Sequence, residues 1–69
     1  PNPVKNTLYL NFSNDSKYLG KEFQISDVNG RVVLKGTIDE MNKALDVSSM
    51  QNGLYFIKIG EVLSKFVKQ

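Results

Sequence analysis

The 69-residue sequence contains no cysteine, no histidine and no tryptophan. Without cysteine there is neither a disulfide framework nor a thiolate nucleophile, and without histidine the common nucleophile–base pairs are missing too. Nitrogen and sulfur ligands for a transition metal are absent for the same reason. We therefore expect a chain that is not an enzyme, with no catalytic residues, no cofactor and no metal.

Few residues could support catalysis or metal binding through carboxylate oxygens. Four acidic residues could pair for hydrolysis or gather around calcium: Asp27, Asp39, Glu40 and Asp46. Simpler interpretations place Asp27 in a turn, Asp39 and Glu40 in a solvated loop, and Asp46 on the outer face of a strand. The five glycines lie apart at turns and strand ends, so they form no phosphate-binding loop.

Charge is small and mixed, because nine basic and seven acidic residues leave a net charge of +2. This balance gives no concentrated field, so we expect no nucleic-acid partner and no direct membrane insertion. No apolar run approaches the length of a membrane span, and no signal peptide is visible. The first residue is Pro1, which we interpret as the start of one domain, residues 1–69, excised from a larger secreted protein.

Apolar residues alternate along the chain and nowhere keep a helical spacing, which predicts an all-β protein. The expected strands are "TLYLNF", "KEFQIS", "RVVLKG", "ALDV", "LYFIKI" and "VLSKFVK". Both faces of "LYFIKI" carry apolar residues, which indicates a central strand. Six strands, with a seventh short strand possible, predict a small antiparallel β-sandwich of immunoglobulin-like shape.

The same alternation assigns side chains to faces of the strands. In the last strand Val62 and Phe66 share one face, and Leu63 and Val67 share the other. Met50, in the turn "SSMQNG", is expected to reach the core. Residues expected to point inward elsewhere are Leu8, Leu10, Phe12, Phe23, Ile25, Leu45 and Val47.

The stretch "DVNGRVVLKG" allows two hairpin turns. A two-residue type I′ loop at Asn29 and Gly30 needs positive φ at both positions and places Ile25 opposite Leu34. A type I turn that begins two residues earlier, with Gly30 as a left-handed bulge residue, places Ile25 opposite Val33. The first alternative matches more apolar pairs and is favoured. Gly30 is structural in both.

Aromatic side chains leave a second class of function open. Stacking on sugars or bases is within reach of Tyr9, Tyr18, Tyr55 and Phe56. The alternative to be kept is therefore a surface adhesion or carbohydrate-binding β-sandwich module, although core packing explains Tyr55 more simply.

Four motifs follow one another in a distinctive order. "PNPV" opens the chain, "ISDVNGRVV" follows, then "LDVSSMQNGLYFIKI", and finally the basic and apolar end "KFVK". This order resembles the C-terminal sorting domain of proteins exported by the type IX secretion system of Gram-negative Bacteroidota. The resemblance covers essentially the whole chain. The family usually carries an aromatic residue ahead of "PNP", whereas this chain starts at Pro1.

The resemblance implies a sorting signal that directs an N-terminal cargo domain, joined to it in cis, across the outer membrane. The route leads from the periplasm to the cell surface or the extracellular space. The implied partners are the outer-membrane secretion machinery and a sortase that often removes the domain. By position, the family motif covers Pro1, Asn2, Pro3, Asp27, Gly30, Arg31, Asn52, Gly53 and Tyr55.

Recognition in this family depends on the terminal segment, here Lys65, Phe66, Val67 and Lys68. One physical account is that this strand adds its backbone to a partner's sheet, with the lysines steering and Phe66 or Val67 entering pockets. The other is that Phe66 belongs to the core and the lysines protect an exposed sheet edge.

Overall fold

The computed structural model describes residues 4–10, 18–39 and 44–69. These ranges hold six β-strands and no helix: β1 (Thr7–Tyr9), β2 (Glu22–Ser26), β3 (Val32–Thr37), β4 (Ala44–Asp46), β5 (Gly53–Ile59) and β6 (Val62–Lys68). The all-β prediction is confirmed. Five residues with predicted roles lie outside the described ranges, namely Pro1, Asn2, Pro3, Phe12 and Glu40. No helix able to span a membrane is found among the described residues.

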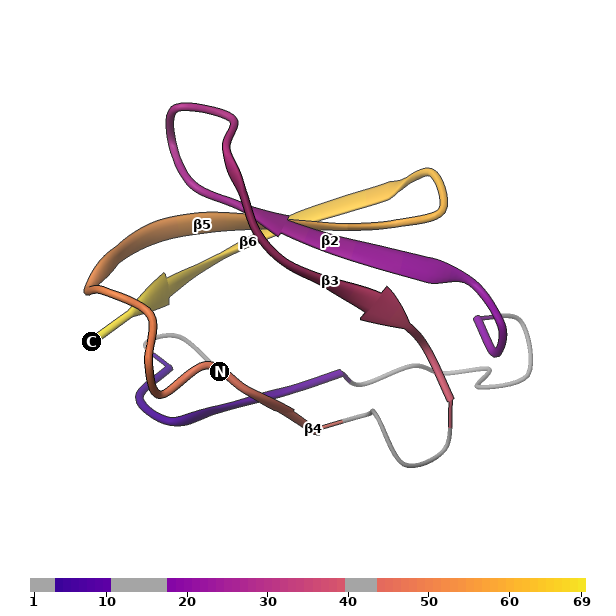
Figure 1. Ribbon diagram of the computed structural model, residues 1–69, viewed down its shortest axis with the longest axis horizontal. Coiled ribbons are helices and arrows are strands. Elements are labelled where there is room, and N and C mark those ends of the chain that lie inside the picture. Colours follow the sequence, from indigo (N-terminus) through magenta and orange to yellow (C-terminus); the bar gives the residue numbers. More distant parts are fainter. Residues whose placement is uncertain (1–3, 11–17, 40–43) are drawn as a thin grey trace.

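The strands form two antiparallel sheets. The larger has the strand order β3-β2-β5-β6, and the smaller consists of β1 and β4. Figure 1 shows the small sheet lying across from the large one. This arrangement agrees with the predicted small sandwich. The position of β5 between β2 and β6 also follows from the apolar residues on both of its faces.

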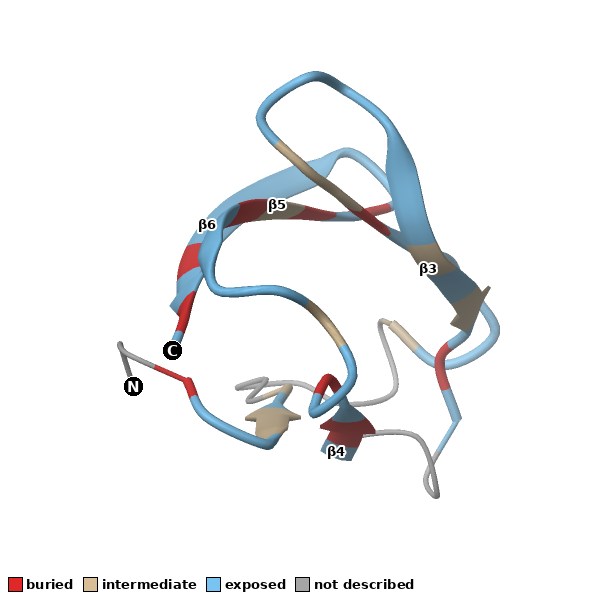
Figure 2. Ribbon diagram, turned by 60° about the vertical axis from the view of Figure 1, so that its left-hand side comes forward, coloured by how far each residue is buried: buried red, intermediate tan, exposed pale blue. Residues whose placement is uncertain are grey.

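The core lies between the two sheets, and Figure 2 marks buried residues on strands of both sheets. The inward positions predicted for Phe23, Ile25, Leu45 and Val47 are confirmed, since each is at most 7% exposed. Burying one such side chain fully stabilises the fold by about 1.5–3 kcal/mol. Met50, Leu8 and Leu10 pack against this core from its margin, and its buried members are Val4, Phe23, Ile25, Ile38, Leu45, Val47, Tyr55, Ile57, Ile59 and Phe66.

The turn of the β2–β3 hairpin differs from the favoured prediction. The Gly30 N–H donates to the Asp27 C=O at 3.0 Å, and the Asp27 N–H donates to the Arg31 C=O at 3.0 Å. Gly30 has a φ of 83°, whereas no described non-glycine residue, Asn29 included, has positive φ. The turn is therefore the type I turn with a left-handed bulge glycine, and the type I′ prediction was wrong.

The register of this hairpin is nevertheless the favoured one at Ile25, which pairs with Leu34. Ser26 pairs with Val32, so the register shifts between Ile25 and Ser26 and leaves Val33 as an extra residue on β3. A β-bulge of this kind moves one strand by one residue against the other. With the type I turn alone, Ile25 would pair with Val33. The bulge at Val33 moves β3 by one residue and so pairs Ile25 with Leu34.

Gly36 on β3 pairs with Phe23 on β2, and the phenyl ring lies over the glycine. A Cβ atom at position 36 would come within 2.9 Å of Phe23 Cε2. The ring is 4% exposed, so it has no room to move aside without opening the core. The missing side chain at Gly36 is what allows the largest inward residue of β2 to fit.

We expect Gly36→Ala to lower the free energy of unfolding by about 1–3 kcal/mol, the usual cost of overpacking a core. Urea denaturation followed by circular dichroism measures this. In a Phe23→Leu background the same substitution should cost much less, because the ring that it meets is gone. A Gly36→Ala variant that is as stable as the parent would contradict the packing described here.

Candidate recognition site

The terminal segment predicted for recognition forms most of β6, an edge strand of the large sheet. Its side chains alternate in exposure. Phe66 and Lys68 lie on the inner face and are buried, while Lys65 and Val67 lie on the outer face and are exposed. Of the four residues, the structure therefore presents two to a partner and holds two against the rest of the fold.

Phe66 packs face to face with Tyr55, with ring centroids 5.7 Å apart and ring planes 22° apart. Offset stacking of this kind adds to the stabilisation from buried area. Lys68 is 6% exposed, and its Nζ donates to the Gln69 C=O at 3.3 Å. These contacts favour the interpretation in which Phe66 belongs to the core.

Lys65 and Val67 belong to a mixed apolar and basic surface on the outer face of β5 and β6. Cross-strand pairing sets Val67 beside Leu54 and Lys65 beside Phe56. No described residue forms an ion pair with Lys58 or Lys65. We call this surface the outer patch, and its members are Leu54, Phe56, Lys58, Leu63, Lys65 and Val67.

The family-motif residues of the β2–β3 loop form one hydrogen-bonded unit around the Asp27 carboxylate. It accepts the Asn29 N–H at 2.9 Å, the Arg31 N–H at 3.0 Å and the Arg31 Nε–H at 3.2 Å. These donors favour the ionised form and hold the pKa of Asp27 below its ordinary value of 3.8. The Arg31 N–H has the largest effect, and burial opposes it.

The second motif segment faces this loop across a groove. The Tyr55 hydroxyl donates to the Gln51 C=O at 2.7 Å and ties the turn before β5 to that strand. A groove of about 510 Å³ separates this turn from the β2–β3 loop. Five residues of the family motif line it, although 20 or more positions separate the two segments: Asp27, Arg31, Asn52, Gly53 and Tyr55.

Asp46, another of the acidic candidates, has a structural role. The Asp46 carboxylate accepts the Ser48 hydroxyl at 2.6 Å and the Ser48 N–H at 3.0 Å, so it caps the turn after β4. The Ser48 hydroxyl is the main cause of a lowered pKa for Asp46. Within residues 4–10, 18–39 and 44–69, no group of three or more acidic residues is placed to hold a metal ion.

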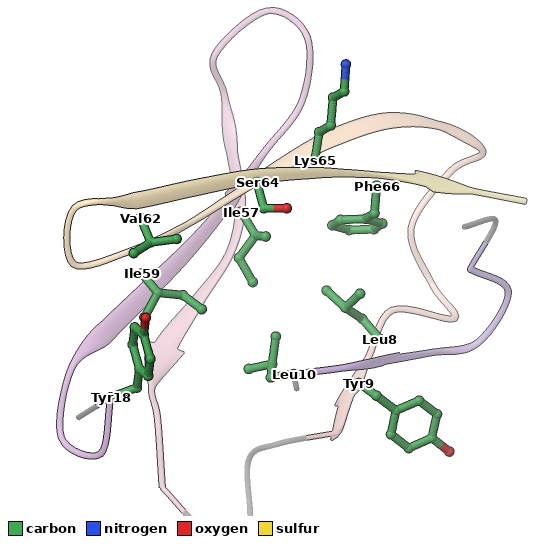
Figure 3. A pocket seen from close by; sticks show the side chains of 10 residues that line it. All are labelled: Leu8, Tyr9, Leu10, Tyr18, Ile57, Ile59, Val62, Ser64, Lys65 and Phe66. Atoms are coloured by element: carbon green, nitrogen blue, oxygen red, sulfur yellow. The ribbon is translucent and has the colours of Figure 1, made fainter. Parts of the chain in front are cut away.

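A cavity of about 410 Å³ lies between the sheets beside β6 (Figure 3). Sequence reasoning missed it, because the alternation of each strand shows which face is apolar but not where two sheets leave a gap. Its lining comes from both ends of the chain: Leu8, Tyr9, Leu10, Tyr18, Ile57, Ile59, Val62, Ser64, Lys65 and Phe66.

The sequence model of the family described as "Secretion system C-terminal sorting domain" matches residues 1–69. The chain belongs to this family. The resemblance carried by the four motifs is thereby confirmed, and the function it implied is that of a C-terminal sorting signal for type IX secretion. Among the curated proteins no match was found. No solved structure matches either.

As a sorting domain, the chain implies interaction with the type IX secretion machinery and a cargo joined in cis. It also implies export to the cell surface or the extracellular space. The comparisons give no support to the adhesion alternative. The recognition role of Lys65, Phe66, Val67 and Lys68 in the sorting domain stays a prediction, which their exposure now divides into an outer and an inner pair.

We expect Asp27 of the sorting domain to titrate below 3.8, as followed by NMR of its carboxyl carbon. Because the pKa is depressed in the folded state, the carboxylate contacts contribute stability above the ordinary pKa. That contribution is lost as the pH falls through the folded-state pKa. Arg31→Ala should raise the pKa only partway, since the backbone N–H at position 31 remains. Titration at or above 3.8 would contradict the loop geometry.

Proposed function

We propose that the sorting domain is a folded, non-catalytic handle that the outer-membrane machinery grips at the outer patch while the cargo travels with it. The observation that supports this most is the exposure of apolar side chains on β5 and β6. Leu63 is 65% exposed, Leu54 is 37% exposed and Val67 is 36% exposed. Contiguous exposed apolar residues with a polar rim are typical of protein-interaction sites.

The other half of the same sheet face has a different character. At corresponding outer positions β2 presents Glu22 and Gln24, and β3 presents Lys35 and Thr37. The outer patch gathers its apolar residues together with Lys58 and Lys65 on β5 and β6. Such lysines steer an acidic partner toward the patch and set its orientation, more than they add affinity.

The cargo precedes Pro1 in this proposal, and the place of Val4 supports a grip at β6. The Val4 N–H donates to the Val67 C=O at 2.7 Å, and the Gln69 N–H donates to the Val4 C=O at 2.7 Å. The start of the described chain is therefore paired with the end of β6. A partner bound at β6 would sit beside the junction with the cargo, where a sortase at the cell surface would cut after passage through the periplasm.

Export of a reporter tests the role of the outer patch. Residues 1–69 are fused behind a reporter with an inner-membrane export signal and produced in a host with a type IX system, and the surface fraction is measured. We expect Lys65→Glu to lower surface delivery by about fivefold, since an exposed charge contact contributes up to about 1 kcal/mol. Adding Val67→Asp should lower it further. Lys35→Glu makes the same charge change on β3 and should have no effect.

Point substitutions at exposed positions serve this test better than removal of the terminal segment. Deleting residues 65–69 would also remove Phe66, which is 3% exposed and packs against Tyr55, so loss of export would report unfolding as well. Equal delivery by the Lys65→Glu, Val67→Asp double variant and by Lys35→Glu would exclude the outer patch. Retention of the parent reporter in the periplasm would overturn the handle itself.

A further inference from the structure

Part of the outer edge of β6 has no strand beside it among residues 4–10, 18–39 and 44–69. A two-residue loop, Gly60 and Glu61, joins β5 to β6, and the flanking Ile59 and Val62 pair directly. In such a hairpin the flanking pair exchanges hydrogen bonds, and every second residue of β6 does the same. The residues between them, beginning with Leu63, therefore turn their N–H and C=O groups away from β5.

The hydrogen bonds of Val4 confirm which residues of β6 turn their main-chain groups away from β5. They also show that Val4 pairs only with the end of β6. It bonds the Val67 C=O and the Gln69 N–H, which point away from β5, and forms a parallel bridge at Lys68. No strand of the described chain lies beside Leu63 and Lys65. The outward main-chain groups of these two residues are a template on which a further strand can pair.

The open edge borders the cavity between the sheets. Figure 3 shows the Lys65 side chain pointing away from this cavity, so Lys65 borders it through its backbone. Leu8 of the small sheet and Leu10, just after the end of β1, face the cavity from one side, and Ile57 of the large sheet faces it from the other. Its volume of about 410 Å³ falls among those of sites that bury a ligand group, which run from about 300 to 1,000 Å³.

The unpaired edge of β6 and the cavity beside it together define which peptide segment can bind. A strand added to β6 alternates its side chains, so those on the inner face lie over the apolar cavity and those on the outer face stand beside Lys65. The first kind should be apolar and the second acidic, because opposite charges on neighbouring strands attract. Val4 limits the length, and the stretch from Leu63 to Lys65 pairs with about three to five residues.

A second copy of the chain fits poorly. Pairing of two β6 edges over Leu63 and Lys65 brings the two Lys65 side chains opposite or diagonal to each other on one face of the joined sheet. Like charges at such positions are destabilising, and a lysine on an edge strand is a common protection against self-pairing. The edge therefore selects a partner of opposite charge.

We propose that the open edge of β6 binds a short extended segment of the secretion machinery, which places an apolar side chain in the cavity and an acidic one beside Lys65. The binding mode is strand addition to a preformed sheet. It deepens the proposed function and rests on it in assigning the segment to that machinery. The chemistry of the edge is tested without the machinery.

The test is an NMR titration of the 69-residue chain with a capped seven-residue peptide. The peptide has glutamate at its odd positions and valine, phenylalanine and valine at its even ones. We expect saturable shifts, with slowed hydrogen exchange of the Leu63 and Lys65 amides. A peptide with lysine for glutamate should bind about fivefold more weakly. A peptide N-methylated at all seven residues, which has no N–H group to donate to β6 in either strand orientation, should bind at least about tenfold more weakly.

Three variants of the chain test the same contact by changing the protein in place of the peptide. Leu63→Pro removes an outward N–H and no bond to β5, as edge positions allow, while Leu63→Ala keeps that N–H. We expect the proline variant to bind the glutamate peptide about tenfold more weakly than the alanine variant. Ser64→Phe, which places a ring at the cavity and leaves the edge backbone intact, should also weaken binding.

The outcomes separate this proposal from the one on which it rests. Absence of binding, equal binding of the N-methylated peptide, or stronger binding of the lysine peptide would each overturn the edge site. Such a result combined with missorting of the Lys65→Glu, Val67→Asp variant would leave the outer patch in place. Peptide binding at the edge combined with normal export of that variant would overturn only the outer patch.

Discussion

The pairing of β5 with β6 is the constraint on which the site depends. The loop at Gly60 and Glu61 has two residues, which fixes the pair Ile59 and Val62 and with it every later pair of the hairpin. A shift of one residue would turn Phe66 outward and Lys65 into the core. The stack of Phe66 on Tyr55 favours the observed phase, because the alternative would break the stack and expose an aromatic ring.

The same pairing determines how the domain meets other proteins. Buried apolar area on one face of β6 holds the strand in place, so its other face and its outer edge are available without loss of the core. A chain of this size buries only about 60% of its unfolded surface and has little stability to spare. Recognition through residues that do not contribute to the core therefore leaves the fold intact when a partner binds or releases.

Strand positions and inward faces followed from the sequence because a period of two depends on nearest neighbours only. The turn at Asn29 and Gly30 did not, since both turn types accept these residues and the deciding event is a bulge at Val33, away from the turn. The outer pair of the terminal segment was predictable by alternation once Phe66 was placed inside. The cavity was not, because Leu8 and Ser64 come together only through packing of the two sheets.

An exported domain with an unpaired sheet edge must avoid pairing with its own copies and still bind its partner. An unpaired edge on a crowded pathway promotes aggregation, and closed folds remove it by pairing every strand. Here Val4 covers the end of β6, and the exposed Lys65 marks the limit of the covered part. Natural proteins commonly shorten or cover an edge strand that binds no partner. An edge left open for two outward residues, with a charge beside it and an apolar cavity beneath it, repels its own copies while it accepts an acidic strand.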